Sequence, residues 1–144
     1  MRSSVPRLLF AVLATVAAAA PALADVRIVS SAGGIVGNYL EFFAQVRRSG
    51  DRVIIDGPCL SACTLVLSTL PRNRICVTPR AVLGFHAPAL VDESGHRYRS
   101  RAATKAVVAS YPPAVQAWIR RHGGLKQDLI YLRGRELAAL YPRC

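Results

Sequence analysis

Residues 57–64, Gly-Pro-Cys-Leu-Ser-Ala-Cys-Thr, constrain the fold of this chain more than any other stretch. They follow a β-branched apolar segment, Arg52–Asp56, and lead into an apolar run from Ala62 to Leu70. Glycine and proline between two such segments predict a tight turn from a strand into a buried helix. A serine on such a turn, here Ser61, presents its hydroxyl and the following peptide N–H at the open end of a sheet.

The rest of the chain alternates between segments typical of strands and of helices. Strands are expected over 26–30, 52–56, 74–78 and 81–86, a last strand or loop over 128–132, and helices over 36–48, 62–70, 101–110, around 115–119 and over 135–140. Residues 87–98 read as a polar loop. Gly33 and Gly34 separate the first strand from the first helix, which makes a βαβ unit with parallel strands. The chain is therefore predicted to be an α/β fold, a small parallel β-sheet with βαβ units packed by helices.

The first helix shows an apolar stripe at helical spacing, which predicts a face packed against the core. The residues of this stripe are Val36, Tyr39, Leu40, Phe43 and Val46.

The N-terminal segment has the features of a secretory signal. Two arginines precede an apolar run, Leu8–Ala20, and a small-residue cleavage signature ends at Ala24. We therefore predict a signal peptide over 1–24 and one domain over 25–144, periplasmic or secreted, with no integral membrane span after cleavage. An uncleaved N-terminal anchor is the alternative.

The chain is strongly basic, with a formal net charge of +11. Its arginines are dispersed and no recognition motif accompanies them, so nucleic-acid binding is not expected. A solvated basic surface that associates weakly with anionic surfaces is the simpler interpretation. No metal site is expected, because Cys-x3-Cys is not zinc-like and no histidine pair has ligand spacing. No cofactor is expected either. The oligomeric state stays open, with a homo-oligomer among the alternatives.

Four cysteines, Cys59, Cys63, Cys76 and Cys144, lie in the predicted mature domain. Export places them in an oxidising compartment, which predicts two disulfides with three alternative connectivities. We prefer Cys63–Cys76, because the helix after Ser61 leads directly into the strand that carries Cys76. This pairing leaves Cys59–Cys144 to hold the C-terminus.

Three candidate functional parts follow strands of the predicted sheet. The Gly33-Gly34 turn follows the first strand, Ser61 follows the second, and His86 ends the fourth. Because sites in open parallel sheets form beyond the carboxyl ends of the strands, these parts are expected to meet. One segment then supplies a nucleophile and another supplies a base.

These segments resemble motifs of the Clp protease proteolytic subunit and its crotonase-like relatives, within which the chain is most similar to exported bacterial proteins of Clp-protease type. Residues 31–36 (Ser-Ala-Gly-Gly-Ile-Val) are similar to the family's Ser-Pro-Gly-Gly-x-Val oxyanion segment. Residues 59–63 (Cys-Leu-Ser-Ala-Cys) resemble its nucleophile turn, and 85–88 (Phe-His-Ala-Pro) resemble its Ile-His-Gln-Pro. Residues 136–141 resemble its closing helix, and the twenty-five residues from Ser61 to His86 agree with Clp-type spacing.

The resemblance implies a serine hydrolase, most simply a peptidase acting on a peptide or protein substrate. Ser61 would be the nucleophile and His86 the base, and the backbone N–H groups of Gly34 and Ala62 would form the oxyanion hole.

The family's third catalytic residue is an acid, for which the nearest candidate is Asp128, three residues from the aligned position. A Ser-His dyad without an acid is one alternative. A Ser61–Lys105 pair of the kind used by the peptidase-A relatives is another.

Two further interpretations stay open. The strands that normally precede the glycine pair in this family have no counterpart here, which favours a non-catalytic binding or structural module with a degenerate Clp-like fold. The other is acyl-thioester chemistry that uses the oxyanion hole without a nucleophile. A distance of ~2.6–3.2 Å between Ser61 Oγ and a His86 nitrogen would favour the hydrolase.

Overall fold

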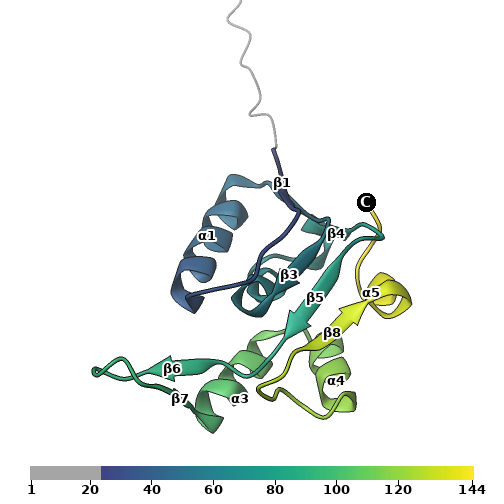
Figure 1. The fold of residues 1–144 in the computed structure, drawn as a ribbon. Coiled ribbons are helices and arrows are strands. Elements are labelled where there is room, and N and C mark those ends of the chain that lie inside the picture. The colour runs from purple at the N-terminus through teal and green to yellow at the C-terminus, as the bar shows by residue number, and fades with distance from the viewer. Residues whose placement is uncertain (1–23) are drawn as a thin grey trace, which may run out of the picture.

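The computed structural model describes residues 24–144, and the predicted signal segment lies outside the described residues apart from Ala24. The chain forms a mixed α/β structure with two three-stranded sheets and a separate hairpin (Figure 1). The strands are β1 (Asp25–Ile28), β2 (Arg52–Ile55), β3 (Pro58–Leu60), β4 (Ile75–Val77), β5 (Val82–Phe85), β6 (Ala89–Val91), β7 (Arg97–Arg99) and β8 (Ile130–Arg133). The α-helices are α1 (Val36–Ser49), α2 (Val66–Thr69), α3 (Arg101–Ser110), α4 (Pro113–Arg121) and α5 (Gly134–Leu140), and short 3₁₀ turns cover Ser61–Leu65 and Arg72–Arg74.

The first sheet confirms the predicted βαβ unit. Strands β1, β2 and β4 pair in that order and all run parallel. Helix α1 connects β1 to β2, as the order of strand, glycine turn, helix and strand predicts. Only part of that stripe enters the core, because Phe43 and Val46 are buried whereas Val36 and Leu40 are about two-fifths exposed at 38% and 42%.

The prediction that all four strands lie in a single sheet is wrong. The turn after β2 contains a strand of its own, β3, which pairs parallel with β5, and β8 adds antiparallel on the other side of β5. The chain passes between the sheets at Gly57, where a side chain has no room because an added Cβ would lie 2.0 Å from the Val29 carbonyl oxygen. Ser31, which follows β1, pairs with β3: its backbone N–H donates to the Pro58 carbonyl and its carbonyl accepts from the Leu60 N–H. The two sheets are joined through the extension of β1.

Two further local predictions differ from the structure. The expected polar loop over 87–98 is a β-hairpin, in which β6 and β7 pair antiparallel and project from the rest of the molecule (Figure 1). Its turn is held by Asp92, whose carboxylate accepts from the backbone N–H groups of Ser94 and His96. The expected helix over 62–70 is a 3₁₀ turn followed by the short α2, and it is buried as predicted.

The disulfides join Cys59 to Cys63 and Cys76 to Cys144, so the pairing preferred from the sequence is wrong. Cys63 lies in the 3₁₀ turn directly after β3, which places it 5.3 Å (Cα–Cα) from Cys59. The C-terminal segment lies beside β4 instead, where the Val77 N–H donates to the Pro142 carbonyl and the Cys144 N–H donates to the Val77 carbonyl. Within residues 24–144, no helix is long and apolar enough to cross a membrane.

Candidate active site

Ser61 occupies a strained position at the start of the 3₁₀ turn. Its φ of +55° lies in the left-handed region, where it is the sole non-glycine residue among residues 24–144. Such a conformation is uncommon for a residue with a side chain and persists where the surroundings enforce it. Here β3 on one side and the buried turn on the other fix the backbone, so that the hydroxyl stands out from the end of the strand as the sequence predicts.

His86 follows β5 and reaches this hydroxyl. Its Nε2 lies 2.7 Å from Ser61 Oγ, and its Nδ1 lies 2.8 Å from the carbonyl oxygen of Ala87. A carbonyl oxygen can only accept, so Nδ1 carries the proton of the neutral imidazole. Nε2 is then unprotonated and accepts from the Ser61 hydroxyl, which is the tautomer that a general base needs.

Neither of the other candidates for the catalytic set meets this pair. Asp128 and Lys105 are exposed, and in the described part of the chain neither forms a hydrogen bond with Ser61 or His86. The position beside His86 Nδ1 is filled by Ala87, which is itself fixed because its N–H donates to the Lys126 carbonyl at 2.6 Å. A backbone carbonyl therefore orients the imidazole, in the position where the sequence analysis expected an acidic side chain.

The glycine pair lies directly against the serine turn. A Cβ on Gly33 would come within 2.6 Å of both the Leu60 carbonyl oxygen and Ser61 Cβ, and within 3.0 Å of the Ala62 nitrogen. Gly33 also has φ +84°, so glycine is required there for space and for conformation. Gly34 and Ala62, the predicted oxyanion-hole residues, line one cavity with Ser61 and His86.

This cavity opens into a groove of about 840 Å³, which we call the Ser61 groove. The glycine segment and the start of α1 form one wall, and the hairpin and α3 form another. Apolar side chains dominate these walls, and they include Ile35, Val36, Leu90, Val91, Val107 and Leu129. The exposure of Val36, which its place in the helix stripe does not predict, follows from its position in this groove.

The disulfide Cys59–Cys63 encloses Ser61 in a five-residue loop. Both cysteines are buried, at 0% and 1% exposure, so the loop is fixed to the core on each side of the serine. The bond removes conformational freedom from the segment whose left-handed residue carries the hydroxyl.

A buried hydrogen-bond chain supports the same turn and was not found from the sequence. Thr64 donates its hydroxyl to the Ser61 carbonyl at 2.7 Å, and its Oγ lies 2.7 Å from the Tyr111 hydroxyl. Burial raises the pKa of Tyr111 to about 12, so the phenol stays protonated and donates to Thr64. The Tyr111 ring also packs edge-on against Phe85, beside His86, at 5.3 Å between centroids. Tyr111 thus contacts both the 3₁₀ turn that begins at Ser61 and strand β5, which precedes His86, and sequence spacing cannot indicate these contacts.

Asp56 fixes the step from β2 to β3 that leads to Ser61. Its buried carboxylate accepts from the Thr78 hydroxyl at 2.6 Å and from the guanidinium groups of Arg27 and Arg80 at 2.7 and 2.5 Å. The Thr78 hydrogen bond, followed by those of the two arginines, lowers the pKa of Asp56 to about 2. Its contribution to stability is therefore present above the pKa of an unfolded aspartate, about 4, and is lost as the pH falls toward 2.

We expect the Asp56→Asn variant to show this pH dependence directly. Between pH 6 and pH 2 the free energy of unfolding of the wild type should fall more steeply than that of the variant, because asparagine does not titrate. Urea unfolding at several pH values measures both slopes. Equal slopes would show that Asp56 does not have a lowered pKa in the folded protein.

Within residues 24–144, no group of three His, Cys, Asp or Glu side chains is placed to hold a metal ion. No family model matches the chain, and no curated protein matches it.

Proposed function

We propose that this chain is an exported serine hydrolase of Clp-protease-like type that cleaves peptide bonds. The single observation that carries the proposal is the Ser61 Oγ–His86 Nε2 distance of 2.7 Å together with the Nδ1 contact to the Ala87 carbonyl. Nucleophile, base and base-orienting group are in hydrogen-bond contact, which is the arrangement that nucleophilic catalysis requires.

In the proposed reaction, Ser61 Oγ attacks the carbonyl carbon of the scissile bond while its proton passes to His86 Nε2. The negative charge on the carbonyl oxygen is stabilised by the N–H groups of Gly34 and Ala62. His86 then gives the proton to the leaving amine, and the bond between carbon and nitrogen breaks. A water molecule, deprotonated by His86, releases the acyl group from Ser61 by the reverse sequence.

The neutral carbonyl of Ala87 has a defined consequence for the rate. It fixes the tautomer and the orientation of His86, as a carboxylate would, but it offers less stabilisation to the imidazolium that forms during attack. We therefore expect slower turnover than in a complete Ser-His-Asp triad, with the covalent step intact.

Export is proposed on two grounds. The N-terminal residues 1–24 have the sequence features of a signal peptide. All four cysteines form disulfides, which persist in oxidising compartments such as the periplasm or the extracellular medium.

Labelling with a fluorophosphonate probe tests the proposal. We expect the folded, disulfide-intact protein to become covalently labelled at Ser61, because the probe reacts with activated serine hydroxyls. The Ser61→Ala variant should show no label, and Ser94→Ala, which removes an exposed hydroxyl from the hairpin turn, should label as the wild type does. Absence of labelling in the folded wild type over a range of pH would instead support the non-catalytic module.

A further inference from the structure

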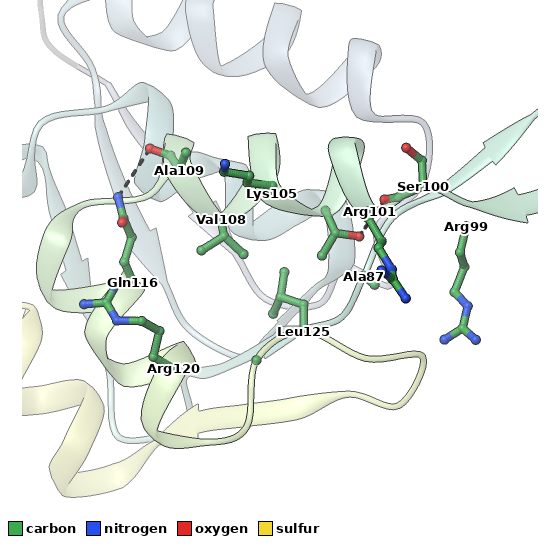
Figure 2. A pocket seen from close by; sticks show the side chains of 12 residues that line it. Ala87, Arg99, Ser100, Arg101, Lys105, Val108, Ala109, Gln116, Arg120 and Leu125 are labelled. Carbon is green, nitrogen blue, oxygen red and sulfur yellow. Dashed lines mark hydrogen bonds between the residues drawn. The ribbon is translucent and has the colours of Figure 1, made fainter.

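A second cavity, distinct from the Ser61 groove, lies between α3 and α4 (Figure 2). We call it the α3–α4 pocket. Its volume is about 1000 Å³. Helix α3 separates the two cavities, with Ala103 and Val107 facing the groove and Lys105 and Val108 lining the pocket.

Basic side chains border the α3–α4 pocket from three elements. Arg99 comes from β7, Arg101 and Lys105 come from α3, and Arg120 comes from α4. Figure 2 shows Arg99 and Arg101 at one end and Arg120 at the other. In the described part of the chain none of the four forms a salt bridge, and no acidic residue lines the pocket.

Apart from Ser100, Thr104 and Gln116, the remaining lining residues are apolar. Val108 and Leu125 lie between the two basic ends, with the buried Ala87 beside them (Figure 2). Cations at both ends of a partly apolar cavity suit a ligand with several separated anionic groups and an apolar body. A small inorganic anion could contact only one end, and guanidinium groups bind carboxylates well in bidentate geometry.

We propose that the α3–α4 pocket binds the acidic segment of a peptide whose scissile bond lies in the Ser61 groove, an inference that rests on the proposed function. The two cavities adjoin along the segment 86–88 and along β7, just before the start of α3. Ala87 lines the pocket while the flanking His86 and Pro88 line the groove, and on β7 Arg99 lines the pocket while Arg97 lines the groove. One extended peptide can therefore occupy both.

The hairpin favours a peptide over an anionic lipid surface. Its turn carries Asp92 and Glu93, which are exposed on an element that projects beyond α3 (Figure 1). A flat anionic surface that reached the pocket would also meet these two carboxylates. A single peptide chain avoids them, because it can enter the pocket from the groove.

Isothermal titration calorimetry with the Ser61→Ala variant tests this inference without hydrolysis. The probes are two ten-residue peptides that share an alanine–valine half. In the other half a leucine is flanked by glutamates in one peptide and by glutamines in the second. Each peptide is made with its two halves in either order along the chain. We expect the glutamate peptide to bind at least about fivefold more tightly in one order, because several weak ion pairs act together. The preference should decrease as salt is added.

Variants identify the pocket as the source of the preference. Adding Arg101→Gln, Lys105→Gln and Arg120→Gln should remove the preference and leave the glutamine peptide's affinity unchanged, and this second peptide also reports that the variant is folded. The matched control, Arg48→Gln, Arg133→Gln and Arg135→Gln, removes three exposed charges elsewhere and should keep the preference.

Two outcomes would overturn the inference. One is an equal affinity of Ser61→Ala for both peptides in both orders. The other is pocket-dependent sedimentation with phosphatidylglycerol vesicles without any preference between the peptides, which would indicate a lipid surface instead. Failure of fluorophosphonate labelling, with the peptide preference intact, would remove the proposed hydrolysis and leave the pocket as an acidic-peptide site.

Discussion

Replacing His86 with alanine is expected to lower kcat/KM for hydrolysis of a fluorogenic peptide or an activated ester by about 10⁴–10⁶-fold. The imidazole is the group in contact with the Ser61 hydroxyl, at 2.7 Å, and without it the hydroxyl stays protonated and attacks poorly. Because the two residues act as one unit, Ser61→Ala combined with His86→Ala should be no slower than either single variant.

The same assay tests Asp128 as the group that supports the base and Lys105 as an alternative base. Asp128→Asn and Lys105→Met should retain activity within about twofold, because both residues are exposed and the Ala87 carbonyl orients His86. A loss beyond about tenfold in Asp128→Asn would mean that a carboxylate completes the site during catalysis. A comparable loss in Lys105→Met, with His86→Ala active, would assign the base to lysine.

Removal of Cys76–Cys144 is expected to affect stability more, and removal of Cys59–Cys63 is expected to affect activity more. Replacing Cys76 and Cys144 by alanine opens a loop with a sequence separation of 68, which should cost about 4 kcal/mol of unfolding free energy in the chain-entropy account. Replacing Cys59 and Cys63 opens a separation of 4, which should cost about 2 kcal/mol. The first variant should keep its activity at temperatures where it is folded. The second should lose activity while still folded, because its loop holds Ser61 at φ +55°.

Chemical denaturation and the rate of fluorophosphonate labelling of the two variants provide the measurements. The labelling rate of the Cys59→Ala/Cys63→Ala variant should fall by about tenfold or more under conditions where circular dichroism shows a folded chain. Labelling at the wild-type rate would show that β3 and the Thr64–Tyr111 contact hold the serine without the disulfide.

The sequence predicts a local element correctly where its pattern of apolar, polar and glycine residues is compatible with only one type of secondary structure. Helix α3 begins and ends where its pattern predicts, and the βαβ unit follows from a glycine turn between an apolar strand and an amphipathic helix. The approach of Ser61 to His86 was also expected, because both residues end strands that point to one edge.

Contacts between distant segments could not be obtained in this way. The hairpin was missed because Ala89–Val91 and Arg97–Arg99 carry no strong strand pattern and are stabilised by pairing with each other. The disulfide pairing depended on where the C-terminal segment lies beside β4, which no local pattern encodes. The role expected of Asp128 depended on alignment, whereas a backbone carbonyl occupies the position beside His86.

By itself, the sequence determined the type of each long element, the glycine positions that the serine turn requires, and the pair of side chains that could react. Those features follow from short-range sterics and from hydrophobic periodicity, which act within a few residues. Tertiary structure alone decided the division into two sheets, the orientation of the imidazole by Ala87, the Thr64–Tyr111 support and the basic pocket behind α3. Each of these depends on which distant surfaces pack together, because a hydrogen bond or an ion site forms only when packing fixes both partners within reach.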